Sequence, residues 1–285
     1  MANVRIFADS TCDLSADLVD KYQVTILPLC IVMDDQSYFD GIEATPEKIF
    51  AWADANKTTP KTAAPSLEYA AKLLKPAMDA GEDIVFFTIS GQMSTTPNVI
   101  RLVGEDAGYT RLFIVDSQNL STGIGLQIIK AAEMAQAGKS AEEIYDWVTQ
   151  RRHLVRASFV VDTLTYLARG GRCNAVTAFL GNALKLHPKI VVKDGTMSVS
   201  KKYVGSINYV IGKYARDMEA ELKAADPARV FITHSSCDPK TVASLREYLQ
   251  SLNHFDEILE TTAGGVISSH CGPQTLGVLF YAQET

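Results

Sequence analysis

The chain carries a histidine beside a cysteine close to its C-terminal end, in the run SSHCGPQTLG at residues 268–277. A cysteine next to a histidine can supply a nucleophile and its base, and both residue types bind metals such as zinc. His270 among small, turn-forming residues can equally donate a hydrogen bond at the edge of a pocket, or have a structural role. We favour the donor, and the other interpretations stay open from these residues alone.

Hydroxyl side chains gather where the predicted strands end. In an open parallel sheet, ligands bind at the edge formed by the carboxyl ends of the strands. Neutral hydroxyl donors there suit an anionic or polar head group, although single serines and threonines more often cap helices or close turns. The residues are Thr62 in the loop at 61–66, Ser90, Ser94 and Thr95 after one strand, Ser117 after the next, and Ser269 and His270 in the final run.

The motifs of well-known catalytic sites are missing or incomplete. The sequence has no G-x-S-x-G segment and no G-x-G-x-x-G segment after its first strand. His234, Cys237, His270 and Cys271 offer four zinc ligands, but neighbours on an extended chain point to opposite sides. We therefore expect no catalytic residue and no metal site. The alternative is a hydrolase or phosphotransfer enzyme that uses a hydroxyl-rich cleft with His270.

Composition narrows the class of protein. The 285 residues suffice for two modest domains, and a net charge of −6 without a long basic run argues against a nucleic-acid partner. Five scattered cysteines suggest a reduced, cytoplasmic protein, and the N-terminus lacks the pattern of a signal peptide. The longest uncharged run, residues 261–283, contains many Gly, Ser and Thr residues. We expect it to form buried strand and turn, with no membrane span.

The order of predicted elements gives the fold class. Strands alternate with helices up to about residue 150, and Ser140 with Glu143 predicts a capping box at the start of the last of these helices. This alternation predicts a parallel sheet covered on both faces. After that point the pattern changes to a hairpin about Asp194-Gly195, two short helical pieces within 165–184, and one long helix from Ser206. We predict an N-terminal parallel-sheet α/β domain at 1–155 and a C-terminal α+β domain at 156–285.

Seven segments occur in one order along essentially the whole chain: DSTCDL (9–14), FDGIEATPE (39–47), KTAAPS (61–66), VDS (115–117), FVVDTLTYLARGGR (159–172), LKLHPKIVVKDG (184–195) and SSHCGPQTLGVLF (268–280). Together these segments resemble the DegV family. The better understood members of that family are the fatty-acid-binding subunits of bacterial fatty acid kinase.

The resemblance implies that one long-chain fatty acid lies in a buried tunnel between the two domains. Matched residue by residue, Thr62, Ser94 and His270 bind its carboxylate. A separate ATP-dependent fatty acid kinase phosphorylates that carboxylate, and the binding subunit does no chemistry. The family places Gly170-Gly171 near the kinase, so the flanking Arg169 and Arg172 are candidate docking residues. The same residues also suit an ordinary helix end.

Five positions depart from the family pattern. Four of them are Ala63 for serine, Thr95 for glycine, Pro97 for an aromatic residue and Gln274 for glycine. The fifth is Val204, which stands where members often carry arginine. Lys202 is a candidate replacement for that cation. The predicted secondary ligand contacts are Ser90, Thr95, Ser117, Lys202 and Ser269.

The sequence therefore predicts a cytoplasmic lipid carrier with no cofactor other than its bound fatty acid. The enzyme described above is one alternative. A carrier whose ligand is not a simple fatty acid is another, because the departures fall near the expected head group.

Overall fold

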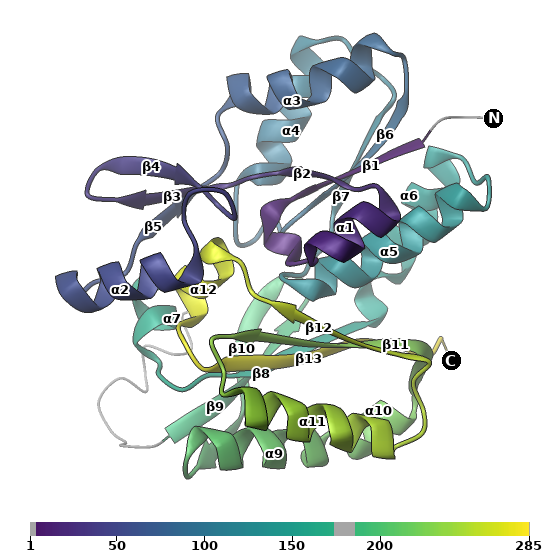
Figure 1. The fold of residues 1–285 in the computed structure, drawn as a ribbon. Helices are drawn as coiled ribbons and strands as arrows, with labels where there is room; N and C mark the ends of the chain where they lie inside the picture. Colours follow the sequence, from purple (N-terminus) through teal and green to yellow (C-terminus); the bar gives the residue numbers. More distant parts are fainter. Residues whose placement is uncertain (1–3, 174–185, 285) are drawn as a thin grey trace.

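The N-terminal half of the protein contains a four-stranded parallel sheet in the order β2-β1-β6-β7. We analysed a computed structural model, which describes residues 4–173 and 186–284 (Figure 1). The sheet consists of β1 (Val4–Asp9), β2 (Thr25–Leu27), β6 (Asp83–Thr88) and β7 (Leu112–Asp116), and a 3-10 turn, η1 (Ser10–Cys12), follows β1.

Helices cover both faces of this sheet, as the alternating pattern predicts. Apolar residues of the strands pack on one side against α3 (Leu67–Asp79) and α4 (Thr96–Asp106). On the other side they pack against α1 (Ala16–Tyr22), α5 (Thr122–Gln136) and α6 (Ala141–Arg151). The capping box expected from Ser140 and Glu143 is present at the start of α6.

A small antiparallel sheet projects from the N-terminal half (Figure 1). Its order is β4-β3-β5, formed by β3 (Cys30–Met33), β4 (Gln36–Phe39) and β5 (Lys61–Ala63), and α2 (Pro46–Asn56) lies in the connection between β4 and β5. The sequence predicted a loop around Thr62, and that prediction is wrong. Thr62 pairs with Ile31 of β3, and the backbone bonds of this ladder fix its position.

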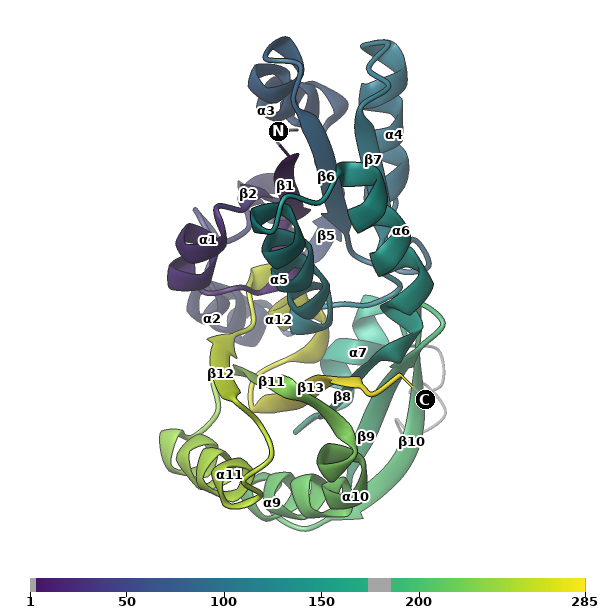
Figure 2. The ribbon, with the colours of Figure 1, turned by 90° about the vertical axis from the view of Figure 1, so that its right-hand side faces the viewer.

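The C-terminal half is built on a six-stranded mixed sheet in the order β10-β9-β8-β13-β11-β12. The strands are β8 (Val155–Val160), β9 (Leu186–Lys193), β10 (Thr196–Val204), β11 (Ala225–Ser235), β12 (Glu257–Thr262) and β13 (Thr275–Ala282), and η2 (Arg152–Leu154) precedes β8. Helices α9 (Ile207–Asp217), α10 (Glu219–Lys223) and α11 (Pro239–Ser251) lie on its outer face (Figure 2).

Two predictions for this half have clear outcomes. The β9–β10 hairpin is confirmed, because Asp194 and Gly195 both adopt positive φ at the predicted turn. The single long helix from Ser206 is wrong, since Met218 leaves the helical conformation and separates α9 from α10. The predicted helical piece at 175–184 lies entirely outside the described residues.

Helix α12 (Gly265–Cys271) lies between the two large sheets and packs against α2, α7 (Thr165–Gly170), β3 and β5. Both views show it there, joined to β12 and β13 (Figures 1 and 2). The expectation of strand and turn throughout 261–283 is therefore wrong. The chain turns into a helix because carboxylates from the N-terminal half accept the backbone N–H groups of Gly264 and Gly265.

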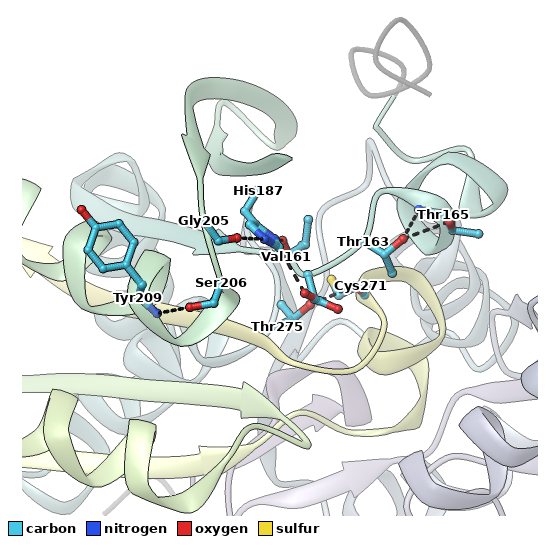
Figure 3. A network of polar contacts seen from close by, with 10 residues as sticks. Val161, Thr163, Thr165, His187, Gly205, Ser206, Tyr209, Cys271 and Thr275 are labelled. Atoms are coloured by element: carbon cyan, nitrogen blue, oxygen red, sulfur yellow. Dashed lines mark hydrogen bonds and ion pairs between the residues drawn. The ribbon is translucent and has the colours of Figure 1, made fainter. Parts of the chain in front are cut away.

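His187, in the LKLHPK segment, ties three parts of the C-terminal half together (Figure 3). Its Nδ1 lies 3.0 Å from the carbonyl oxygen of Val161, and its Nε2 lies 3.1 Å from that of Gly205. These bonds join the start of β9 to the ends of β8 and β10. The histidine is 3% exposed, so a structural role accounts for this part of the motif.

The fold class is confirmed, with a parallel α/β half followed by a mixed-sheet half. The domain boundary at residue 155 stays a prediction. Within the described residues, no helix combines the length and apolar character needed to cross a bilayer.

Candidate functional site: a cavity between the two halves

The three predicted head-group residues line one cavity of about 440 Å³. Thr62 comes from β5, Ser94 from the turn before α4, and His270 from the last turn of α12. The rest of the described wall is mostly apolar and includes several polar residues. It comprises Leu29, Ala63, Ala64, Ile89, Gly91, Gln92, Met93, Thr95, Asn98, Leu120, Arg172, Met197, Val266, Ile267 and Cys271.

Thr62 and His270 are directly bonded. Thr62 Oγ1 lies 2.8 Å from His270 Nε2, across 208 positions of sequence. The other ring nitrogen, Nδ1, is buried without a hydrogen-bond partner among the described residues. A buried N–H left unpaired costs more than an unpaired lone pair, so the tautomer with the proton on Nε2 is favoured. His270 then donates to Thr62, and the Thr62 hydroxyl proton is available to a ligand.

His270 is neutral at physiological pH. Burial, assisted by the nearby Arg172 guanidinium, lowers the pKa of the imidazole to about 4. A charged imidazolium is therefore disfavoured. The positive charge in this cavity comes from Arg172, which lines it. The N-terminal end of the α4 dipole also favours a bound anion, since α4 has no acidic residue in its first turn.

Gly170 makes room for the His270 ring. A Cβ built on Gly170 would lie 2.3 Å from His270 Nδ1, far inside van der Waals contact. Gly171 has a positive φ and ends α7, as expected for a helix C-cap. The two glycines of the GGR segment thus have different functions. One permits close packing against the histidine, and the other permits the turn that leads to Arg172.

Buried carboxylates hold the start of α12, the helix that carries His270. Asp13 accepts the N–H of Gly264 at 2.8 Å, and Asp40 accepts those of Gly265 at 2.7 Å and Val266 at 3.3 Å. Both aspartates come from the N-terminal half, from the DSTCDL and FDG segments. The two segments therefore fix α12, and with it His270, relative to β5 and α4.

Burial raises the pKa values of these carboxyl groups. The pKa of Asp13 rises to about 8 and that of the neighbouring Asp9 to about 6, and the pKa of Asp40 is also raised. Hydroxyl partners oppose the shift, with Ser121 Oγ 2.5 Å from Asp13 and Ser10 Oγ 2.7 Å from Asp40. Burial therefore makes these carboxyl groups easier to protonate in the folded state than in the unfolded chain.

Ser94 is held by the start of α4. Its Oγ accepts the N–H of Thr96 at 3.2 Å and lies 2.9 Å from Thr96 Oγ1. The neighbouring Thr95 also lines the cavity, as predicted for a secondary contact. The position of Ser94 at a helix start directs a hydroxyl and the positive end of the helix dipole toward the same space.

Four predicted secondary contacts are not among the described residues that line this cavity. Three of them bond within the protein: Ser90 Oγ donates to the Gly195 carbonyl at 2.7 Å, Ser269 Oγ to that of Gly265 at 2.8 Å, and Ser117 Oγ to that of Asn119 at 3.3 Å. Their hydroxyl protons are therefore already used. Lys202 is exposed on β10 and does not substitute for the family arginine in this cavity.

The sequence analysis missed two functions. It made Arg172 a candidate for kinase docking or for an ordinary helix end, whereas that residue also lines the cavity. It also gave no role to Asp13 and Asp40, although both lie in segments that carried the family resemblance. A buried aspartate cannot be told from an exposed one by local pattern, so position within a family motif was the available signal.

Cys271 does not have the environment of a nucleophile. The side chain is buried, and burial raises the pKa of its thiol to about 12. His270 and Cys271 lie on a helix, which corrects the extended geometry used to judge a zinc site. Among residues 4–173 and 186–284, no three His, Cys, Asp or Glu side chains are placed to share a metal ion.

Comparison with known proteins identifies the family. A family model described as "Uncharacterised protein, DegV family" matches residues 3–283, and the chain belongs to the DegV family. A DegV domain-containing protein of Deinococcus radiodurans is 29% identical over 276 residues, covering 97% of each chain. The resemblance inferred from the seven sequence segments is therefore confirmed.

Solved structures of this family share the fold. A DegV family protein of Thermus thermophilus, described as fatty-acid binding, has a TM-score of 0.89 and 29% identity, covering 99% of this chain and 100% of its own. A stearic-acid-binding protein of Eubacterium ventriosum has a TM-score of 0.85 and 26% identity, covering 99% of this chain and 98% of its own.

The packing of Gly170 against His270 gives a first prediction. Gly170→Ala will displace the imidazole and break its bond to Thr62, because the new methyl group would overlap Nδ1. We expect at least tenfold weaker retention of whatever ligand the cavity binds, measured by competition with a fluorescent probe. Gly212→Ala is the matched control, since that helical glycine has its nearest neighbour at 3.4 Å. Equal affinities for the two variants would contradict the assignment.

The raised pKa of Asp13 gives a second prediction. The folded-state pKa, about 8, lies above the ordinary 3.8, so folding binds a proton between these values and stability falls as pH rises through that window. Each such group contributes a slope of up to about 1.4 kcal/mol per pH unit. Between pH 6 and 8, Asp13→Asn should lose less stability than the wild type in urea titrations. The exposed Asp17→Asn is the control, and parallel curves for both variants would refute the prediction.

Proposed function

We propose that this protein is a cytoplasmic carrier that binds one long-chain fatty acid in the cavity between its halves and presents the carboxylate to a separate ATP-dependent kinase. The observation that carries the proposal is the bonded Thr62–His270 pair, which lines one largely apolar cavity together with Ser94. The protein itself performs no chemistry in this account. The solved relatives described as fatty-acid binding support the ligand class.

The apolar wall suits an alkyl chain. Leu29, Ile89 and Leu120 contribute aliphatic side chains from three connecting segments and Ile267 contributes one from α12, and Met93 and Met197 add flexible thioethers. Each buried methylene of a ligand contributes roughly 0.8 kcal/mol, so a sixteen-carbon chain gains about 10 kcal/mol before the cost of ordering it. A methionine-rich wall also adapts to chains of different shape.

The polar residues of the cavity suit a carboxylate. The Thr62 hydroxyl, oriented by His270, and the Ser94 hydroxyl supply neutral donors, and Arg172 supplies the charge that a buried carboxylate requires. The neutral state of His270 makes Arg172 more important, because the imidazole contributes a hydrogen bond without a charge. The departures at Ala63 and Thr95 leave all of these groups in place.

The Thr62–His270 pair also has the separation of a nucleophile and its base, which is the specific observation in favour of an enzyme. Two features oppose that reading. The pKa of about 4 makes His270 a weak base at neutral pH. Its Nδ1 faces Gly170 and has no carboxylate partner among the described residues to orient the ring. We therefore assign the pair to ligand binding.

The kinase interaction is assigned to the GGR segment. Arg172 lines the cavity and Arg169 lies three residues before it, in the last turn of α7, so a partner bound to this segment would lie close to a carboxylate in the cavity. Val204, which stands where the family often has arginine, is 70% exposed at the end of β10 and supplies no charge there.

The ligand assignment is tested with the purified protein. Native mass spectrometry should show one bound fatty acid per chain, and the Thr62→Val/Ser94→Ala double variant should bind fatty acid at least tenfold more weakly with an unchanged circular dichroism spectrum. The reason is that both hydroxyl donors are lost while the volume is nearly kept. The matched control is Ser90→Ala, whose hydroxyl bonds inside the protein. A wild-type protein that takes up no fatty acid, or a double variant with full affinity, would overturn the assignment.

The kinase assignment has a separate test. ATP-dependent acyl phosphate formation by a bacterial fatty acid kinase, trapped with hydroxylamine, should be at least tenfold slower with Arg169→Gln or Arg172→Gln. Fatty-acid affinity should fall only for Arg172→Gln, because that residue alone of the two lines the cavity. Wild-type protein that binds fatty acid and yields no acyl phosphate would remove the kinase role and leave the carrier role intact.

A further inference from the structure

A second cavity, of about 500 Å³, opens beside the C-terminal sheet and shares no described lining residue with the first. We call it the β8–β9 cavity. It lies where η2 meets the first residues of β8, the last residues of β9 and helix α10. Its described lining consists of Gln118, Asn119, Arg152, His153, Val155, Arg156, Ala157, Ser158, Lys189, Val191, Val192, Lys193, Asp194, Glu221 and Phe280.

Basic side chains dominate the charge of this cavity. Arg152, Arg156, Lys189 and Lys193 line it, against two acidic residues, Asp194 and Glu221. None of these four cations forms an ion pair within the part of the chain that the structure describes. The protein as a whole has a net charge of −6, so a recess with four cations that form no ion pair differs in sign from the rest of the molecule.

The two arginines are already held in place by backbone carbonyls. Arg152 Nη1 donates to the carbonyl oxygen of Asp116 at 2.7 Å, and Arg156 Nη1 donates to that of His153 at 2.9 Å. Each bond uses one of the five N–H donors of a guanidinium and limits its rotation. The remaining donors are therefore partly preorganised for an anion, which reduces the entropy lost on binding.

Lys189 provides the strongest argument for a ligand. It is half-buried at the cavity, and burial lowers the pKa of its ammonium group, with Glu221 and Asp217 opposing the shift and Lys201 adding to it. Its Nζ lies 5.6 Å from the centre of the buried Tyr214 ring, a modest cation–π contact. Removing a cation from water without a bonded carboxylate costs free energy, and a bound anion beside the cation would offset that desolvation free energy.

We propose that the β8–β9 cavity is a binding site for a small molecule that carries a phosphate group. Two arginine forks and two ammonium groups match the charge and multiple acceptor oxygens of a phosphate dianion better than those of a single carboxylate. The compact recess, without an extended basic stripe, favours a small molecule over a nucleic acid. Free inorganic phosphate and a nucleoside monophosphate both have this chemistry. The site is independent of the fatty-acid cavity.

Isothermal titration calorimetry with inorganic phosphate and, separately, with AMP tests the site in the full-length protein. We expect saturable binding of at least one probe, with tighter AMP binding if the ligand is a phosphate ester and tighter phosphate binding if it is the free ion. Lys189→Met should weaken that binding at least tenfold. Arg156→Gln, at an exposed position that does not threaten folding, should weaken it at least fivefold.

The matched control is Lys75→Met, an exposed lysine that is paired with Asp79 at 2.8 Å and lies outside the described cavity lining. Its affinity for the probe should equal that of the wild type. Absence of saturable binding for both probes, or binding that Lys189→Met and Arg156→Gln leave unchanged, overturns the proposal. Fatty-acid retention should be unaffected in all three variants, which separates this test from that of the first cavity.

Discussion

The structure depends on the contact between buried carboxyl groups of the N-terminal half and the first N–H groups of α12. Asp13 and Asp40 satisfy backbone donors that would otherwise be buried and unpaired, since Gly264 and Gly265 begin a helix between the two sheets. A Cβ on Gly265 would lie 2.7 Å from side-chain atoms of Ile31 and Ile49, so this close approach requires glycine. The contact joins the two halves and fixes His270.

The polar residues that line the cavity come from distant parts of the chain. His270 reaches Thr62 of the small sheet, Gly170 of α7 leaves space for the ring, and Ser94 starts α4. Because burial keeps the imidazole neutral, Arg172 supplies the positive charge. An anion bound in this cavity would meet neutral hydrogen-bond donors and one cation. The rest of the wall consists largely of aliphatic and thioether side chains.

Local pattern was enough to predict the alternating elements of the parallel sheet, the Ser140 capping box and the Asp194-Gly195 hairpin, because periodicity and turn residues encode them directly. It failed for α12, where a helix starts at two glycines only because distant aspartates accept their N–H groups. It also failed to separate Ser94, which lines the cavity, from Ser90, whose hydroxyl bonds to Gly195. Both failures concern partners that lie far away in sequence.

A crystal structure of the protein purified from bacteria with its co-purifying ligand tests the central claim most directly. The account predicts elongated density in the cavity, with a carboxylate within hydrogen-bond distance of Thr62 Oγ1 and Ser94 Oγ and with the Arg172 guanidinium nearby. A cavity without such density after incubation with oleic acid would contradict it. A fatty acid whose carboxylate lies away from Thr62 and Ser94 would contradict it equally.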